Sequence, residues 1–309
     1  MTKPRIAVIG AGAFGQNHCR VVRESDRADL VAVVDLDPAR GTLTDYRQLP
    51  GQIDAAIVSA PTVVHEEIAT FLLAAGIDVL VEKPIAPDLA AADRMVGAAG
   101  RHGRILQVGH LERFNPAVVE IERRCTLPLF FEVHRMNQFS PRSLDVDVVL
   151  DLMIHDVDIV LGMATGEPTE IRAAGISILS PKVDIANVRL AFANGCVANL
   201  TASRISTERV RKLRLFQPHQ YLSLDYSRQD LAIFSVQEGR IGFEQAPVTK
   251  SEPLKLQFEA FLDSIATRNS PKSSGDAARR TLSVALAIID KIEEHSEVVS
   301  HTLEAGWKP

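Results

Sequence analysis

The sequence predicts an α/β protein: an N-terminal domain with a parallel sheet, then an α+β domain with one large, mostly antiparallel open sheet. Apolar strands alternate with amphipathic helices from residue 5 to about 110, which indicates parallel βαβ units. A glycine-rich turn follows the first strand, and short β-type runs joined by tight turns fill residues 169–236. The 309 residues suit two domains, which we place at 1–115 and 116–309.

The elements of the first domain follow from short apolar runs and their stop signals. Gly76 is expected to end one helix, and Asp88 to cap the next. Strands are expected at 6–9, 30–34, 55–59, 78–82 and 105–109, and helices at 14–23, 65–75 and 89–100.

In the second domain, successive strands replace the alternation, and Asn194-Gly195 is the strongest hairpin signal of the chain. Strands are expected at 129–136, 169–178, 184–193, 196–203, 209–217, 220–226 and 229–236, and helices at 116–124, 146–162, 254–268 and 276–294. An open sheet with one face uncovered by helices invites pairing with another subunit. We therefore expect a homodimer or homotetramer formed through this sheet.

The turn after the first strand has the composition of a dinucleotide site. Gly10, Gly12 and Gly15 give the spacing G-x-G-x-x-G between a buried strand and a helix. The first glycine permits the tight turn, the second lets the backbone approach a pyrophosphate, and the third allows close packing of helix on strand. The phosphates would lie on the N-terminus of the helix. The pattern predicts a Rossmann domain.

Asp35 ends the second strand, twenty positions after the last glycine. A carboxylate at this place is expected to accept hydrogen bonds from an adenosine ribose, and it would repel a ribose 2′-phosphate. The sequence therefore favours NAD over NADP as the cofactor. Arg40 lies nearby, and its positive charge weakens the preference for NAD.

Ligands of such a sheet bind outside the carboxyl ends of its strands. We expect the cofactor to contact the residues that follow those ends: Gly10, Gly12, Ala13, Phe14, Gly15, Asp35, Ala60, Pro61, Thr62, His65, Glu82, Lys83 and Pro84. Lys83 directly follows a buried strand, and we expect it to project toward the nicotinamide. Near that positive charge and away from water its pKa should fall, so that it can exchange a proton with a hydroxyl. A solvated lysine at a strand end is the alternative.

A second group of polar residues lies in the apolar segment 147–160. Asp151 and His155 stand at i and i+4, which makes them neighbours on one helical face. A histidine is the usual acceptor of a hydroxyl proton as hydride leaves the same carbon, although a helical histidine is more often structural. Metal binding is disfavoured because no third and fourth ligand is evident, and no G-x-S-x-G elbow supports a serine hydrolase.

Basic residues cluster from the end of the first domain onward: Arg113, Arg135, Arg142, Arg204, Arg209, Arg211, Lys212 and Arg214. In an acidic protein they are candidates for binding a substrate phosphate or carboxylate, and a solvated strand face is an equal alternative for residues 204–214. The residues that we expect to contact substrate are His110, Arg113, Asn115, Arg142, Asp151 and His155.

Composition narrows the setting in which the protein works. Hydrophobic residues at 46% and charged residues at 24% describe a globular protein, and a net charge of −5 gives no general attraction to nucleic acid or anionic membranes. Three scattered cysteines, Cys19, Cys125 and Cys196, suggest a reducing compartment. No run is long and apolar enough to span a bilayer, and a strand beginning by residue 5 leaves no room for a signal peptide. We expect a cytoplasmic protein.

With Gly10-Ala-Gly-Ala-Phe-Gly15, Glu82-Lys83-Pro84 and Asp151-x-x-x-His155 in this order, the chain resembles the glucose–fructose oxidoreductase/inositol dehydrogenase/MocA (Gfo/Idh/MocA) family over essentially its whole length. The resemblance implies NAD(P)-dependent oxidation or reduction of a sugar or cyclitol hydroxyl. It also implies that Lys83, Asp151 and His155 form the catalytic group and that Lys83-Pro84 shapes the nicotinamide site. One departure is Met153, where many members have glycine.

Within the family, residues 108–117 and 150–158 look like the UDP-N-acetylglucosamine 3-dehydrogenase branch, whose members oxidise the sugar C3 hydroxyl to a ketone. We therefore expect hydride transfer from a sugar ring carbon to NAD, with His155 or Lys83 taking the proton and Asp151 orienting them. A dehydrogenase of a free sugar or inositol is the first alternative, and it would not need the arginines. A sensor of the same fold that has lost turnover is the second, and the retained Lys83 and His155 argue against it.

Overall fold

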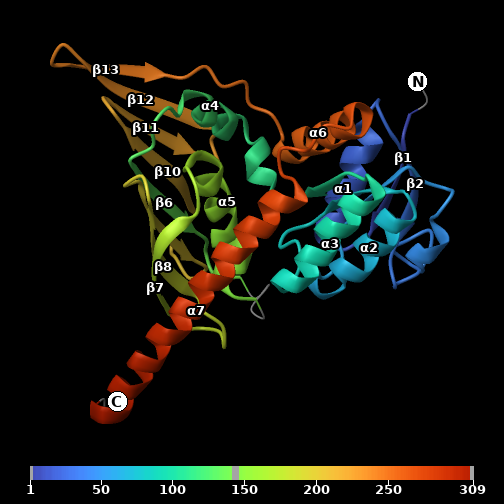
Figure 1. Cartoon of the computed structure of the whole chain (residues 1–309), viewed down its shortest axis with the longest axis horizontal. Helices are drawn as coiled ribbons and strands as arrows, with labels where there is room; N and C mark the ends of the chain where they lie inside the picture. Colours follow the sequence, from blue (N-terminus) through green and yellow to red (C-terminus); the bar gives the residue numbers. More distant parts are fainter. Residues whose placement is uncertain (1–2, 141–145, 307–309) are drawn as a thin grey trace. The chain divides into compact units, whose positions relative to one another are not determined.

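The computed structural model describes residues 3–140 and 146–306 of the chain (Figure 1). The chain folds into two compact units. The first contains the chain up to Phe114 together with Ser251–Leu282, and the second contains Asn115–Lys250 together with the chain from Ser283 onward. Helix α7 (Gly275–Gly306) therefore begins in the first unit and continues in the second.

The first unit is built on a five-stranded parallel sheet, as the alternation of strands and helices predicts. Its strands have the spatial order β2-β1-β3-β4-β5. They are β1 (Arg5–Ile9), β2 (Asp29–Val34), β3 (Ala55–Val58), β4 (Asp78–Val81) and β5 (Leu106–Val108). Every residue of β3, β4 and β5 is buried, because helices cover a parallel sheet on both faces.

Four helices belong wholly to the first unit: α1 (Ala13–Glu24), α2 (His65–Ala74), α3 (Leu89–His102) and α6 (Pro253–Thr267). The predicted cap is confirmed, since Asp88 accepts a hydrogen bond from the Ala91 N–H at 2.8 Å. Helix α6 comes from far along the chain, yet Phe258 and Phe261 are buried in the same core as β1. An ion pair of 2.8 Å between Arg27 and Glu259 also ties α6 to the first part of the chain.

The second unit is built on an eight-stranded sheet in the order β13-β12-β11-β10-β6-β9-β8-β7. Neighbouring strands are antiparallel except β6 and β9, which confirms the mostly antiparallel sheet. The strands are β6 (Phe130–Met136), β7 (Pro168–Ile176), β8 (Ile185–Phe192), β9 (Val197–Ser203), β10 (Val210–Gln217), β11 (Gln220–Asp225), β12 (Asp230–Gln237) and β13 (Arg240–Gln245). The sequence did not predict β13, an edge strand whose six residues are all exposed.

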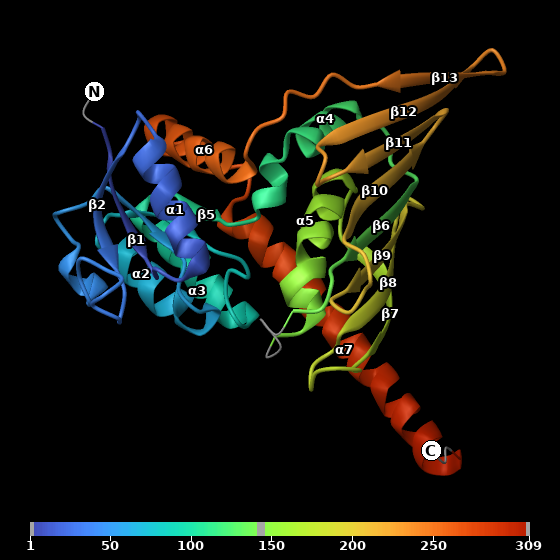
Figure 2. The same ribbon diagram turned by 180° about the vertical axis from the view of Figure 1, so that it is seen from behind.

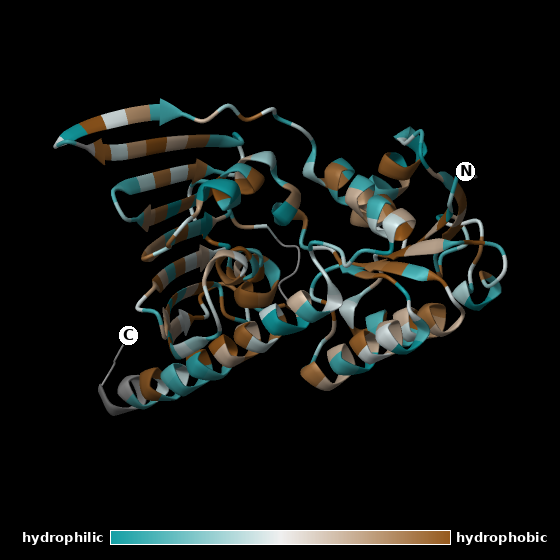
Figure 3. Ribbon diagram, turned by 45° about the horizontal axis from the view of Figure 1, so that its top comes forward, coloured by the Kyte–Doolittle hydropathy of each residue, from teal (hydrophilic) through white to brown (hydrophobic). Residues whose placement is uncertain are grey.

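Helices α4 (Pro116–Arg124), α5 (Ile154–Met163) and the later part of α7 cover one face of this sheet (Figure 2). Figure 3 shows hydrophobic and hydrophilic residues alternating along the strands, as expected where one face is packed and the other is not. The predicted hairpin joins β8 to β9. Gly195 has φ +86° and donates to the Phe192 carbonyl at 2.9 Å, while the Asn194 side chain accepts from the Cys196 N–H at 3.0 Å.

The segment predicted as one helix over 146–162 is divided. Residues Val149–Met153 form a π-helical turn, and α5 begins directly after it at Ile154. Single π-turns inside α-helices are frequent at functional sites. The wider turn holds Asp151, one of the two polar residues that the sequence singled out in this segment.

Three further properties concern the whole of the described chain. None of its helices is both long and apolar enough to cross a membrane. Within residues 3–140 and 146–306, no three His, Cys, Asp or Glu side chains gather as ligands of a metal ion. Cys19, Cys125 and Cys196 form no disulfide, and burial raises the pKa of the Cys196 thiol to about 11.

Candidate active site

The glycine turn has the shape that a dinucleotide requires. Gly10 has φ +90°, and a Cβ there would lie 2.5 Å from the Ser59 carbonyl oxygen. A Cβ at Gly15 would lie 1.9 Å from the Gly10 oxygen, so both glycines are demanded by the packing of the chain itself. Gly12 is different, because a Cβ at this position would meet no described atom within 4 Å. Its bare backbone fits a pyrophosphate that approaches the N-terminus of α1.

Asp35 lies at the end of β2 and shapes the same turn. Its carboxylate accepts hydrogen bonds from the Asp37 N–H at 2.9 Å and the Ala11 N–H at 2.7 Å. These bonds, with the charge of Arg40, lower the pKa of Asp35, so the group is ionised at neutral pH. A carboxylate can accept more than two hydrogen bonds, which leaves capacity for a ribose.

We expect Asp35→Ala to raise the dissociation constant of NAD by about 10–100-fold, the range for hydrogen bonds to a charged group. NADP should be affected less, because the substitution also removes repulsion of a 2′-phosphate. Calorimetric titration with each dinucleotide measures both changes. An unchanged NAD-to-NADP ratio would refute the ribose assignment.

Glu82 follows β4 and makes protein contacts. Its carboxylate bonds with Nε2 of the buried His18 at 2.8 Å and accepts from the backbone N–H of Lys83 at 3.2 Å. A Cβ at Gly109 would lie 2.5 Å from Glu82 Oε2, so the glycine after β5 makes room for this carboxylate. Glu82 therefore fixes the backbone from which Lys83 extends, and the Lys83 side chain is partly exposed.

The remaining residues predicted to contact the cofactor differ in exposure. Ala13, Phe14 and Pro61 are exposed, while Ala60 and Thr62 are partly buried beside them in the chain. Pro84 follows Lys83 through a cis peptide bond and is buried. His65 is buried, and its ring lies against backbone carbonyl groups.

Some of the residues after β5 contact other parts of the protein, and others reach the surface. His110 is 1% exposed, and Arg113 is partly exposed with its carbonyl bonded to Lys272 Nζ at 2.9 Å. Asn115 has a structural role, because its amide caps α4 through the Ala117 N–H at 3.1 Å and donates to the Tyr226 carbonyl at 3.0 Å. Arg142 lies outside the described residues.

In the second unit, Asp151 and His155 stand out by their solvent access. Every residue from 152 to 161 is buried except His155, and Asp151 just before them is also partly exposed. Two titratable side chains one turn apart are thus partly accessible to solvent in a segment that is otherwise mostly buried. Met153, where the family often has glycine, is fully buried in the core, so its side chain does not crowd the exposed face.

Directly after His155, Asp156 forms a buried ion pair with Arg135 of β6. The contacts are bidentate, at 2.7 Å and 2.8 Å, and both side chains are 2% exposed. The Arg135 guanidinium also lies over the Tyr226 ring, 4.9 Å from its centroid. The sequence made Arg135 a candidate for substrate binding. In the structure its guanidinium binds Asp156 and so holds α5 against the sheet.

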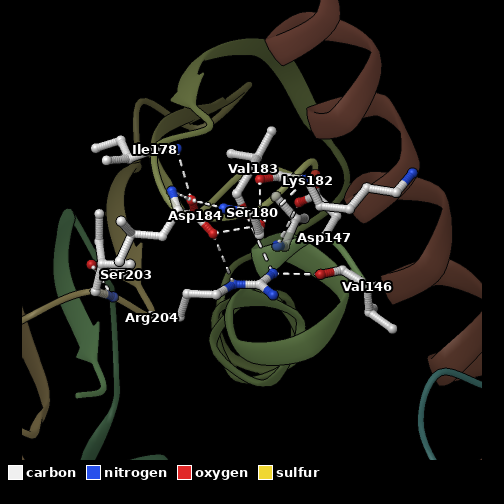
Figure 4. Close-up of polar contacts among 12 residues, drawn as sticks. Val146, Asp147, Ile178, Ser180, Lys182, Val183, Asp184, Ser203 and Arg204 are labelled. Atoms are coloured by element: carbon white, nitrogen blue, oxygen red, sulfur yellow. Dashed lines mark hydrogen bonds and ion pairs between the residues drawn. The ribbon is translucent and has the colours of Figure 1, made fainter. Parts of the chain in front are cut away.

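The basic group 204–214 is also divided by the structure. Arg204 is buried, with Nε 3.7 Å from Asp184 Oδ1 and Nη2 bonded to the carbonyls of Val146 and Val183 (Figure 4). Arg214 pairs with Glu132 at 3.0 Å on the open face of the sheet. Arg211 of β10 lies directly opposite Arg135 in the register with β6, so its side chain is on the face of the sheet covered by α5.

Asp184, at the centre of Figure 4, organises the loop between β7 and β8. It accepts from the backbone N–H groups of Ile178, Leu179 and Ser180 at 2.7, 2.6 and 3.0 Å. Through Arg204 this network reaches Val146, and Asp147 then accepts from the Val149 N–H at 2.8 Å. The network thus anchors the start of the π-turn that carries Asp151.

Sequence reasoning missed the pairs that support these residues. His18 and Glu82 are 64 positions apart, and Arg135 and Asp156 are 21 apart, so no local pattern joins them. The available signal was the type of residue: a histidine on the apolar face of α1 and an arginine at an inward position of β6.

Comparisons with known proteins agree with both units. A family model described as an oxidoreductase family with an NAD-binding Rossmann fold matches residues 4–110, and the GFO/IDH/MocA C-terminal domain matches residues 98–217. UDP-N-acetylglucosamine 3-dehydrogenase of Acidithiobacillus ferrooxidans is 32% identical over 95% of this chain and 98% of its own length. Inositol 2-dehydrogenase of Acidothermus cellulolyticus is 33% identical, over 55% of this chain and 56% of its own.

Solved structures give the same result. UDP-N-acetylglucosamine 3-dehydrogenase GnnA from Acidithiobacillus ferrooxidans matches with a TM-score of 0.90 at 32% identity, covering 96% of this chain and 99% of that one. A putative myo-inositol dehydrogenase from Sinorhizobium meliloti shares the fold with a TM-score of 0.81 at 21% identity, covering 94% and 98%. The chain belongs to the Gfo/Idh/MocA family of oxidoreductases with an NAD-binding Rossmann fold.

Proposed function

We propose that this protein is an NAD-dependent dehydrogenase that oxidises a hydroxyl of a nucleotide sugar, and that the substrate is UDP-N-acetylglucosamine, oxidised at C3. The observation that carries the catalytic assignment is the partial exposure of Asp151 and His155 beside residues that are buried from 152 to 161. The 32% sequence identity to a UDP-N-acetylglucosamine 3-dehydrogenase, over nearly the full length of both chains, supports the choice of substrate. The match to inositol 2-dehydrogenase covers about half of each chain and supports the alternative less.

In this proposal the glycine turn binds the pyrophosphate and Asp35 binds the adenosine ribose. Bound NAD supplies the acceptor for the hydride that leaves the sugar carbon. The hydroxyl proton passes to His155 or Lys83, and Asp151 orients the histidine and stabilises its charged form. The pair between Arg135 and Asp156 holds α5, and so the histidine next to it, in a fixed rotation.

A nucleotide sugar also needs cationic partners for its diphosphate. We propose Arg113 and Arg211 for this role, because both are partly exposed whereas Arg135 and Arg204 are buried. Binding of a free sugar or inositol would not require them.

The test is incubation of the protein with NAD and a panel of UDP-sugars, free sugars and inositol, following NADH by its absorbance. We expect NADH with UDP-N-acetylglucosamine. Turnover with inositol or free glucose alone would overturn the nucleotide-sugar assignment. NAD binding without turnover on any member of the panel would favour a sensor of the same fold.

We further propose that the protein forms a homodimer or homotetramer through the open face of the second sheet. A row of aromatic rings runs across that face on five strands, with centroids 4.8–5.8 Å apart: Phe130, Phe216, Tyr221, Phe234 and Phe243. Phe243 is 65% exposed and Ile241 beside it 78% exposed, which is costly for a monomer.

We also propose that the protein works in the cytoplasm. Its cysteines form no disulfide, as expected in a reducing compartment.

The oligomer is tested by sedimentation of the wild type and of Phe243→Lys. We expect the wild type to sediment as a dimer or tetramer, and the lysine variant to dissociate toward monomer because a charge would be buried in the contact. A monomeric wild type would contradict the proposal.

A further inference from the structure

We propose that His65 is a positioning residue of the NAD site, whose buried ring holds the loop after β3 against the turn after β4. From sequence we expected this histidine to contact the cofactor directly. The structure shows the protein groups that its ring contacts, and all of them belong to the first unit. The inference rests on NAD binding by the family fold and is independent of which sugar the protein oxidises.

The contacts of the ring join two separate segments. His65 is the first residue of α2 and is 1% exposed. Its Nε2 lies 2.8 Å from the carbonyl oxygen of Ala60, directly after β3. Its Nδ1 lies 3.0 Å from the carbonyl oxygen of Pro84 and 3.3 Å from that of Ile85, after β4. The imidazole therefore lies between two segments: the loop Ala60–Thr62 after β3 and the turn after β4 that carries Lys83.

An imidazole suits this bridge for a chemical reason. Carbonyl oxygens only accept hydrogen bonds, so the ring must donate, and a neutral imidazole has one N–H. The ring therefore donates to the carbonyl of one segment and packs against the carbonyl of the other with its second nitrogen. Burial lowers the pKa of His65, and the carbonyls of Ala60, Pro84 and Ile85 act in the opposite direction. A phenyl ring fills a similar volume without a donor, and an asparagine amide carries donors on a shorter side chain.

Loss of the ring's hydrogen bond would leave a buried carbonyl without its donor, and the two segments would separate to reach water. Those segments carry Ala60–Thr62 and Lys83-Pro84, which the sequence predicts as contacts of the cofactor. The cost would therefore appear as weaker NAD binding, in addition to lower stability. A histidine that merely fills the core would lower stability alone.

The unit offers a matched control at the opposite edge of the sheet. Asp78 begins β4 and is 3% exposed, and it accepts from Arg268 at the end of α6 at 2.6 Å and 3.0 Å. Arg268→Met leaves a buried carboxylate unpaired and should destabilise the same unit. It lies at the amino ends of the strands, away from the carboxyl ends where the cofactor binds.

The experiment compares His65→Phe, His65→Asn and Arg268→Met by calorimetric titration with NAD in the absence of substrate, and by thermal unfolding without NAD. We expect His65→Phe to raise the NAD dissociation constant about tenfold, the size of one lost hydrogen bond to a buried group. His65→Asn should lie between it and the wild type. Arg268→Met should lower the unfolding temperature with an NAD dissociation constant within about twofold of the wild type, well below the tenfold factor of one such bond.

Two results would overturn the inference. One is unchanged NAD affinity in the His65 variants. The other is an equal loss of affinity in Arg268→Met, which would mean that any loss of stability weakens binding. Should His65→Phe fail to fold, His65→Asn alone decides between these outcomes.

Discussion

Replacement of Lys83 with methionine is expected to abolish turnover while leaving NAD affinity within a few-fold of the wild type. Methionine keeps much of the length of the side chain and cannot carry a proton. General acid–base catalysis contributes about 10²–10⁴-fold, so kcat should fall by at least 100-fold. The glycine turn and Asp35 are untouched by the change, and they supply the contacts to pyrophosphate and ribose.

The measurement is the rate of NADH formation together with calorimetric titration of NAD. Lys255→Met, an exposed lysine on α6 of the same unit, is the matched control and should behave as the wild type. Retained turnover in Lys83→Met would remove the lysine from the chemistry. A large loss of NAD binding would instead make it a binding residue.

The second large effect concerns stability. Arg135→Met is expected to lower the free energy of unfolding by about 3–5 kcal/mol, because it leaves the Asp156 carboxylate buried without its partner. The double variant Arg135→Met/Asp156→Leu should recover most of that loss, since an apolar pair replaces the ion pair.

Chemical denaturation of the two variants measures the difference. Arg214→Met is the control for an exposed pair, and it should change the unfolding free energy by less than about 1 kcal/mol. A single Arg135 variant as mild as this control would show that the buried pair contributes little.

The first unit was predicted closely because its rules are local. A strand, a glycine turn and a helix follow one another within a few residues, and the Asp88 cap bonds three positions away at Ala91. The hairpin at Asn194-Gly195 is equally local, since the backbone at Gly195 needs positive φ. The glycines were predicted for the same reason: Gly15 is required by its contact with Gly10 within the turn, and Gly10 has positive φ there, although its close contact with Ser59 is distant in sequence.

The features that the sequence could not predict depend on contacts between residues far apart in the chain. The periodicity of α6 predicts an amphipathic helix, and nothing local says that Phe258 packs into the core of the first unit. The π-turn at Val149–Met153 continues directly into α5, and its sequence fits an α-helix equally well, so no local pattern distinguishes the two. An arginine in a strand usually indicates a solvated face, and Arg135 is buried because of an aspartate 21 positions away.

The protein contacts of His65 could not be predicted for a related reason. A polar residue near the carboxyl end of a parallel strand is a natural candidate for ligand contact, and sequence cannot reveal that backbone carbonyls of another loop occupy both sides of its ring. Arg204 is similar: its partners lie in the loop before β8 and at Val146.

The central claim is that hydride leaves C3 of a nucleotide sugar for NAD. It is tested most directly by supplying UDP-N-acetylglucosamine labelled with deuterium at C3 and determining the mass of the NADH produced. We expect one deuterium in each NADH molecule formed. NADH that carries no deuterium, or no NADH at all from a protein that binds NAD, would contradict it.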